Sequence, residues 1–490
     1  MVLELKKLMG VLLLSGILML SGFSSFYSVM ALDHETIVRR ELEIDLGNGL
    51  KTKAQLTYPS IGKGPFPCVL LVQGSGNVDM NGYTPSWATG TGEASTPLRQ
   101  IAEYLSERGF VVLRYNKRGV GSDSSLLDQE IFLNITFQSL MQDAETALQV
   151  LVEQVEVDAN DVTIIGHSEG AIIAPRIACE YPCVKKIILL GSVAHNLRDI
   201  LEFQTVDRKV AYLEEVIDED QNGLISIKEV ISLGDSDIFL PVPDFTLIEN
   251  STGEWQWPPG IDSDEDGLLS IQEEYAPRNR GYLGMVTTPE YPLFKWFRSH
   301  FALDPTLSMI GNVSCSVLLL QGEDDVQTPI QEAFLLEQRL SQVKHLDHTL
   351  RSYPGLGHSF YPVDGWKQPL GPIQDYVLSD ITAWLTDPAR NVQYFQSHLQ
   401  ISEIIIGELQ GQQADFNSEL AQQNEELNKL VEEWDSESLD MEQTIDELNN
   451  WNLELQLFLI SSRNLTYIAL GLSLFTVVKS LRANSGRDSN

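Results

Sequence analysis

One short segment of the chain has the residue types and spacing of an acyl-transfer nucleophile. The pentapeptide Gly166-His-Ser-Glu-Gly170 directly follows an apolar run that we predict to be a strand, and a helical pattern follows it. A G-x-S-x-G sequence between strand and helix is typical of a nucleophile elbow, whose glycines permit a turn too tight for a β-carbon. We therefore predict that Ser168 is a nucleophile at a helix N-terminus, where developing negative charge is favoured.

An acid and a base that could activate this serine follow downstream. The segment Gln321-Gly-Glu-Asp-Asp325 comes after a predicted strand, and a carboxylate at a strand's end can orient an imidazole. The segment Pro354-Gly-Leu-Gly-His358 presents a histidine in a glycine-flanked loop. The chain order of nucleophile, acid and base predicts a triad of Ser168, an aspartate of the first segment and His358.

A glycine-rich turn could complete such a site with hydrogen-bond donors. Gln73-Gly-Ser-Gly76 follows a predicted strand at 68–72, so the backbone N–H of Ser75 can point into the site. Together with the N–H of Glu169, it would form an oxyanion hole for the tetrahedral intermediate. This chemistry needs no cofactor.

Two acidic segments match the twelve-residue calcium-binding loop of EF-hand proteins. In each loop, oxygen-bearing side chains stand at positions 1, 3 and 5, a glycine at position 6 and a glutamate at position 12. Position 7 contributes its main-chain carbonyl. The predicted Ca²⁺ ligands are Asp218, Asp220, Asn222, Leu224 and Glu229 in the first loop and Asp262, Asp264, Asp266, Leu268 and Glu273 in the second.

The surroundings of the two loops differ. The first loop follows a helical pattern and resembles a helix-loop-helix EF-hand, whereas the second follows Trp255-Gln-Trp257-Pro-Pro259 and lacks an entering helix. We expect Ile225 and Leu269 to pair the loops through a short β contact, and we expect Ca²⁺ to have a structural role. Solvated acidic loops with a turn glycine are the other interpretation.

The elements that must position these residues are predicted from apolar runs that alternate with helical patterns. Continuous apolar runs are expected for strands covered on both faces. The predicted strands are 68–72, 111–114, 162–165, 187–190 and 317–320. Helices are predicted at 98–108 and 137–154. This alternation predicts right-handed crossovers and an α/β fold with a doubly wound, mostly parallel sheet.

With these motifs the chain resembles α/β-hydrolases of the dienelactone-hydrolase-related or serine-aminopeptidase-like esterase group. The resemblance covers about residues 36–200 and 290–390, and it also rests on Leu113-Arg-Tyr-Asn-Lys-Arg-Gly-Val-Gly121. The family carries its acid three residues after the glycine of the acid segment, which implies Asp325 rather than Asp324. Asn116 stands where the family usually has aspartate, so the resemblance does not predict the substrate side of the pocket.

The resemblance also implies how the chain is divided. It implies an α/β-hydrolase core formed by residues 32–198 and 306–390, with residues 199–305 inserted as a cap that carries the two calcium loops. Ser168 would be the nucleophile and His358 the base. The implied activity is that of a carboxylesterase on small acyl esters. A serine peptidase that trims short peptides would share the triad.

Both ends of the chain carry apolar segments. Lys6 and Lys7 precede an apolar run and then small residues, which predicts a signal peptide at 1–31, with a retained anchor as the alternative. Residues 461–481 are apolar and are followed by basic residues. This pattern predicts a transmembrane helix with a cytoplasmic tail at 482–490, with a packed terminal helix as the alternative.

The segment before that helix has a heptad pattern. Apolar residues recur at every seventh position from Val392 to Leu455, with Gln413 as the exception. This pattern predicts a coiled-coil stalk at 391–460 and a homo-oligomer, and a helical hairpin is the other interpretation.

Composition limits the remaining functions. The 490-residue chain has a net charge of −36, which repels phosphates and argues against nucleic-acid binding. Its four cysteines are too few for a disulfide scaffold, and Cys179 and Cys183 could be bonded or free. The sequence predicts a serine hydrolase at the cell surface, anchored in the plasma membrane with its hydrolase domain outside. A non-catalytic, calcium-dependent adhesion or oligomerisation protein is the alternative from another class.

Overall fold

The computed structural model describes residues 36–62, 64–232, 247–249 and 253–387, and, beyond these, 407, 410–411, 413–426 and 429. The chain divides into two compact units, Met1–Trp384 and Leu385–Asn490. The predicted signal peptide, transmembrane helix and tail lie outside the described residues. The predicted coiled coil lies mostly outside them, and residues 413–426 of it are helical. None of the described helices combines the length and apolar character that a membrane crossing requires.

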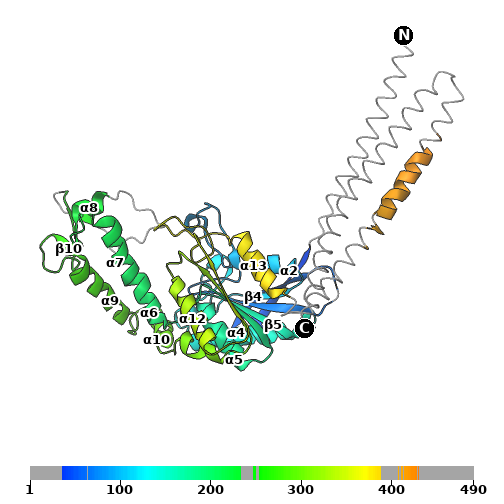
Figure 1. The fold of residues 1–490 in the computed structure, drawn as a ribbon, viewed down its shortest axis with the longest axis horizontal. Helices are drawn as coiled ribbons and strands as arrows, with labels where there is room; N and C mark the ends of the chain where they lie inside the picture. The colour runs from blue at the N-terminus through cyan, green and yellow to red at the C-terminus, as the bar shows by residue number, and fades with distance from the viewer. Residues whose placement is uncertain are drawn as a thin grey trace, which may run out of the picture. The chain divides into compact units, whose positions relative to one another are not determined.

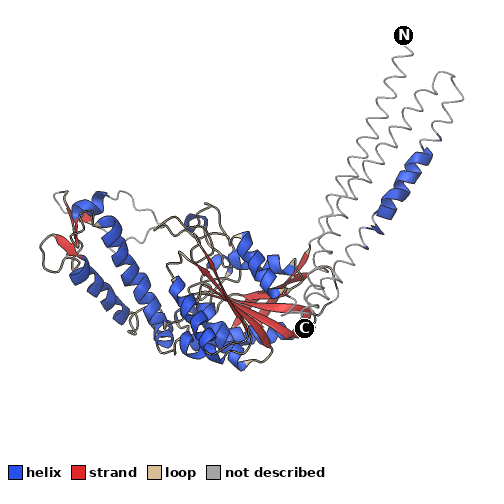
Figure 2. Cartoon of the chain, in the orientation of Figure 1, coloured by secondary structure: helices blue, strands red, loops and turns tan. Residues whose placement is uncertain are grey.

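An eight-stranded sheet forms the centre of the first unit (Figure 2). Its strand order is β1-β2-β4-β3-β5-β6-β11-β12. The first two strands are antiparallel to their neighbours and the other strands are parallel, which confirms the predicted mostly parallel sheet. The strands are β1 (Ile37–Asp45), β2 (Lys51–Pro59), β3 (Phe66–Val72), β4 (Val111–Tyr115), β5 (Val157–His167), β6 (Val184–Leu190), β11 (Ser316–Gly322) and β12 (His348–Tyr353).

Helices cover both faces of this sheet (Figure 1). The predicted helix at 137–154 is α4, which begins after a capping box of Thr136 and Ser139 and buries the apolar face of Leu140, Ala144 and Leu148 against the sheet. The main core helices are α2 (Pro97–Ser106), α4 (Phe137–Val152), α5 (Glu169–Glu180), α12 (Ile330–Gln342) and α13 (Asp375–Leu385). Shorter elements are η1 (Ser86–Ala88), η2 (Ser122–Ser124), α3 (Gln129–Leu133) and η6 (Ile310–Asn312).

The segment between β6 and β11, which includes residues 199–305 of the predicted cap and is called the cap below, connects two strands that are direct neighbours in the sheet. A helical run with π-helical turns leads from Leu197 to Ile217. Its elements are α6 (Leu197–Glu202), η3 (Phe203–Asp207), α7 (Arg208–Tyr212) and η4 (Leu213–Ile217). The later elements are β7 (Leu224–Ser226), α8 (Ile227–Ser232), β8 (Ile248–Glu249), β9 (Trp255–Gln256), β10 (Leu268–Ser270), η5 (Ile271–Tyr275), α9 (Ala276–Met285), α10 (Phe294–Phe301) and α11 (Thr306–Met309).

The cap has a hydrophobic core of its own. The apolar residues of both acidic loops contribute to it, and Trp366, from the segment after β12, packs against Tyr212 at a ring-centroid distance of 5.3 Å. The buried members are Tyr212, Leu213, Ile217, Ile225, Leu247, Trp257, Ile261, Leu269, Ile271 and Tyr275. Burial of these side chains holds the two loops together. All four cysteines of the chain are free thiols, including Cys179 and Cys183.

Candidate active site

Ser168 lies in a sharp turn between β5 and α5. Its φ of 55° and ψ of −113° are strained for a residue with a side chain. A β-carbon on Gly166 would lie 2.1 Å from the carbonyl oxygen of Gly170, and one on Gly170 would lie 2.2 Å from that of Val72. The predicted elbow is therefore confirmed, and both glycines are required by backbone contacts.

Asp325 and His358 are hydrogen-bonded. The Oδ2 of Asp325 accepts from His358 Nδ1 at 2.8 Å, and the same carboxylate accepts from the Thr328 hydroxyl, two backbone N–H groups and the amide of Gln321. Burial alone would raise the pKa of Asp325, but the imidazole and these donors together hold it below its usual value. With Nδ1 bound in this way, Nε2 is the ring nitrogen that remains to take a proton.

The imidazole lies beside the elbow. The backbone N–H of Ser168 donates to Leu190, the last residue of β6, at 2.8 Å. A β-carbon on the next residue, Gly191, would lie 2.9 Å from Cε1 of His358. The ring of His167, adjacent to the serine, lies 4.7 Å from the ring of His358 between centroids. The structure thus brings the three predicted residues to one edge of the sheet.

The two peptide groups predicted to form the oxyanion hole also lie near the elbow. A β-carbon on Gly74 would lie 3.1 Å from Cβ of Ser168, so the Gln73–Gly76 turn packs against Ser168. Glu169 is the first residue of α5, and the first N–H groups of a helix have no acceptor within it. Both N–H groups therefore belong to segments that lie next to Ser168.

Sequence reasoning missed a buried polar cluster behind these donors. Lys117 Nζ lies 2.6 Å from Oε2 of Glu169, and Trp296 Nε1 of α10 donates to Oε1 at 2.6 Å. Nε2 of His300 lies 2.9 Å from the same Oε1, although its N–H is not aligned for a hydrogen bond. Burial would raise the pKa of Glu169, but Lys117 and His300 lower it below its usual value. Lys117 belongs to the segment 113–121 on which the family resemblance partly rests, whereas no sequence pattern pointed to Trp296 or His300.

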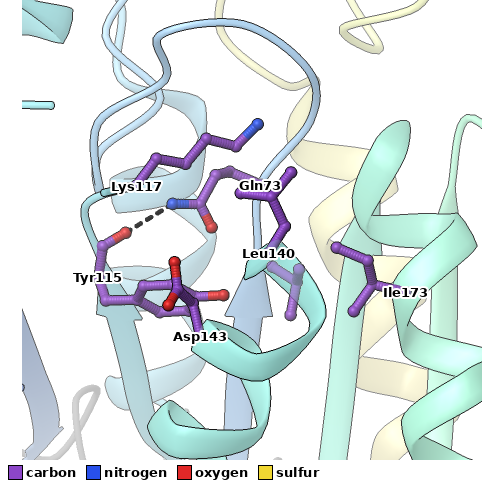
Figure 3. Close-up of a pocket in the computed structure, with 7 residues that line it drawn as sticks. Gln73, Tyr115, Lys117, Leu140, Asp143 and Ile173 are labelled. Atoms are coloured by element: carbon purple, nitrogen blue, oxygen red, sulfur yellow. Dashed lines mark hydrogen bonds between the residues drawn. The ribbon is translucent and has the colours of Figure 1, made fainter. Parts of the chain in front are cut away.

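A small pocket lies beside this cluster (Figure 3). Gln73 is the first residue of the Gln73–Gly76 turn. Its Nε2 donates to the carbonyl of Tyr115 at 2.7 Å, which connects the turn to the end of β4. The space is comparable to a single water molecule, so it is a packing void and not a substrate site. Its lining residues are Val72, Gln73, Tyr115, Lys117, Leu140, Asp143 and Ile173.

The two acidic loops lie next to each other in the cap. Strands β7 and β10 pair antiparallel with Ile225 opposite Leu269, which confirms the predicted contact. Gly223 and Gly267 at position 6 have φ values of 81° and 88°, the left-handed region that glycine permits. As expected, a helical run enters the first loop, whereas the second follows the short β8–β9 hairpin.

Each loop gathers carboxylates. In the first loop, one oxygen each of Asp218, Asp220 and Glu229 lies within 4.8 Å of the others. Asn222 and Leu224 are joined by a hydrogen bond from the Leu224 N–H to Oδ1 of Asn222, at 2.7 Å.

In the second loop the cluster is formed by Asp262, Asp264 and Glu274, and not by the predicted Glu273. Glu273 is exposed. The exit helix starts with the π-helical turn η5, which is wider than an α-helical turn and so changes which side chain faces the loop. Asp266 accepts the N–H of Leu268 at 2.8 Å, as Asn222 does for Leu224 in the first loop.

Comparisons with known proteins show that part of the chain is similar to hydrolases. A family model described as "Serine aminopeptidase, S33" matches residues 87–213. Esterase EstD of Thermotoga maritima is 31% identical over 201 residues, which are 40% of this chain and 42% of EstD. Esterase FrsA of Yersinia enterocolitica is 25% identical over 170 residues, which are 34% of this chain and 35% of FrsA. The chain thus spans less than half the length of these relatives.

Among solved structures, the α/β hydrolase GrgF from Penicillium sp. sh18 aligns with a TM-score of 0.39 and 17% identity, over 74% of this chain and 99% of GrgF. The matched residues 87–213 include β4, β5, β6 and the elbow at Ser168, so this part of the chain is similar to hydrolases of the serine aminopeptidase family and to the esterase relatives.

Proposed function

We propose that the protein is a carboxylesterase that hydrolyses small acyl esters through a covalent acyl-enzyme. Ser168 acts as nucleophile, His358 as general base and then general acid, and Asp325 orients the imidazole. The observation that carries this proposal is the 2.8 Å hydrogen bond from Nδ1 of His358 to Oδ2 of Asp325, with the ring beside the elbow that presents Ser168.

The reaction follows from these positions. Nε2 of His358 takes the hydroxyl proton of Ser168 as its oxygen attacks the ester carbonyl carbon, and Asp325 stabilises the imidazolium without becoming protonated. The N–H groups of Ser75 and Glu169 donate to the oxyanion. His358 then protonates the departing alcohol. Water, activated by the same ring, hydrolyses the acyl-enzyme and regenerates the serine.

A serine peptidase of the aminopeptidase type is the second candidate, because the matching family model carries that description. The esterase is preferred since EstD and FrsA are both described as esterases. Hydrolysis of p-nitrophenyl esters without cleavage of aminoacyl anilides would decide for the esterase, and the reverse would decide for the peptidase.

The cap is proposed to bind two structural Ca²⁺ ions. Three carboxylates converge in each loop, and one oxygen of Asp262 is buried with no hydrogen-bond partner. Converging carboxylates repel each other unless a cation or proton neutralises them, and hard oxygen ligands suit Ca²⁺. Bound ions would rigidify the paired loops and the cap core around Ile225 and Leu269.

The location of the protein is proposed from sequence patterns alone. A signal peptide at 1–31, a coiled-coil stalk at 391–460 and a membrane helix at 461–481 would place an oligomeric hydrolase at the cell surface.

Active-site variants test the proposed chemistry. Ser168→Ala should remove labelling by a fluorophosphonate and lower kcat on p-nitrophenyl acetate by about 10⁴-fold or more. Asp325→Asn should lower kcat by about 10⁴-fold, because it favours the wrong imidazole tautomer. Asp324→Asn is the matched control, since its exposed carboxylate only accepts the N–H of Gly355 and should leave kcat near that of the wild type. Full activity in Ser168→Ala would refute the proposal.

A further inference from the structure

We propose that Lys117 is a positioning residue that holds both oxyanion-hole donors through a single ammonium group. This inference rests on the proposed function and assigns a role to a residue outside the triad. Lys117 follows β4, and its side chain is only 5% exposed. It reaches two different segments, the turn that contains Ser75 and the start of α5 at Glu169.

The first contact acts on the peptide group of Ser75. Nζ of Lys117 donates to the carbonyl oxygen of Gly74 at 2.5 Å. That carbonyl and the N–H of Ser75 belong to the same planar peptide unit, in which C=O and N–H point in opposite directions. Because the ammonium holds the carbonyl, it also sets the direction of the N–H. A positive charge at the carbonyl further polarises that N–H and strengthens it as a donor.

The second contact acts on the other donor. The same Nζ lies 2.6 Å from Oε2 of Glu169, whose backbone N–H begins α5. The other carboxylate oxygen is held by Trp296 Nε1 at 2.6 Å, so the side chain of Glu169 is fixed from the core and from the cap helix α10. The position of the Glu169 N–H relative to Ser168 is therefore set by the cluster.

Such a cluster is poorly explained by stability alone. Burying an ammonium and a carboxylate costs solvation that their attraction often only offsets, so a buried ion pair is weak evidence of net stabilisation. The chain contains another pair of comparable burial, Lys186 with Asp161, whose side chains are 3% and 14% exposed. That pair joins β6 to β5 at the end of the sheet away from Ser168 and gives a matched comparison.

The test uses double variants of the full-length protein, so that no unpaired charge is left buried. Lys117→Met with Glu169→Gln should lower kcat on p-nitrophenyl acetate by about 10- to 100-fold with KM within about twofold, because a displaced oxyanion donor weakens binding of the transition state. Lys186→Met with Asp161→Asn should keep the wild-type kcat. Melting temperatures of both double variants establish that they are folded.

A second measurement separates positioning from a merely structural role. A trifluoromethyl ketone forms a tetrahedral adduct with an oxyanion, so its affinity should fall by the same factor as kcat/KM in the Lys117 double variant. Equal kcat and equal ketone affinity in the two double variants would overturn the inference. So would a loss of kcat without a loss of ketone affinity. If the wild type hydrolyses no ester and reacts with no fluorophosphonate, the proposed function itself fails and this inference fails with it.

Discussion

Glu274 in the second acidic loop of the cap occupies the position that corresponds to Glu229 in the first loop. Oε2 of Glu229 accepts the backbone N–H of Ser226 at 2.7 Å, and Oε2 of Glu274 accepts that of Ser270 at 2.8 Å. In both loops the other oxygen of the glutamate accepts the N–H of the loop's second residue. The two loops therefore close in the same way, although the glutamates stand at different positions in the loop.

This equivalence makes a prediction that separates two neighbouring glutamates. Glu274→Gln should weaken Ca²⁺ binding by about tenfold or more, which removes about 1.4 kcal/mol of calcium-dependent stability at a saturating concentration. Glu273→Gln should leave that stability unchanged, because its side chain is exposed and outside the cluster. The measurement is the melting temperature with Ca²⁺ and with a chelator. A larger effect from Glu273→Gln would show that position 12 is the ligand after all.

The same experiment tests whether calcium binds at all. The wild-type protein should melt at a lower temperature in chelator, and Asp218→Asn combined with Asp262→Asn should abolish this difference. Each of these aspartates accepts the N–H of its loop's position-6 glycine, so both support the turn as well as the cluster. No response of the wild type to chelator would remove the calcium proposal.

The geometry of the elbow predicts that alanine is not tolerated at Gly166 but is tolerated at Gly281. Gly166→Ala should prevent folding or abolish activity, because its β-carbon would lie 2.1 Å from a backbone oxygen that cannot move independently. Gly281→Ala in α9 is the control, since its β-carbon meets no atom within 4 Å. We expect the control to be stabilised by up to about 1 kcal/mol through helix propensity. Soluble expression, urea unfolding and ester hydrolysis measure both variants. An active, stable Gly166→Ala protein would contradict the geometry of the turn.

Burial of His167 predicts a dependence of stability on pH. The pKa of His167 is lowered to about 4, below the value of 6.5 for an unfolded histidine. Burial is the largest cause, and the charge of His358 is the second. The unfolded chain then binds more protons between these values, so stability is present above pH 6.5 and is lost as the pH falls toward 4. The loss between pH 7 and pH 5 is about 2 kcal/mol from this group.

His167→Gln should reduce that loss, because glutamine does not titrate. Urea unfolding at pH 7 and pH 5 measures the difference for wild type and variant. Glu169 contributes only at lower pH, since its depressed pKa means that its stabilisation is lost as the carboxylate is protonated in acid. Equal losses in the wild type and in His167→Gln between these two pH values would contradict this assignment.

Local patterns were sufficient for much of the site. The elbow around Ser168 could be predicted because its requirement, two glycines between a strand and a helix, is met by residues adjacent in the sequence. The pairing of the two acidic loops through Ile225 and Leu269 was predictable for the same reason. The strands were predictable because continuous apolar runs are needed wherever both faces of a sheet are covered.

The exit from the second loop shows where a local pattern fails. The twelve-residue spacing pointed to Glu273, but the spacing assumes a regular helical turn. The π-helical turn at Ile271–Tyr275 brings Glu274 to the loop instead. The helical form of that turn depends on how Ile271 and Tyr275 pack in the cap core, which the loop sequence alone does not specify.

The sequence by itself predicted the elbow around Ser168, the order of the acid and histidine segments and the alternation that builds the sheet. Only the tertiary structure decided what surrounds them. Glu169 meets Lys117 and Trp296, which are 52 and 127 residues away along the chain. Residues so distant leave no periodic or spaced pattern, because their contact is created by the packing of the cap and core around a shared site and not by the local conformation of the chain.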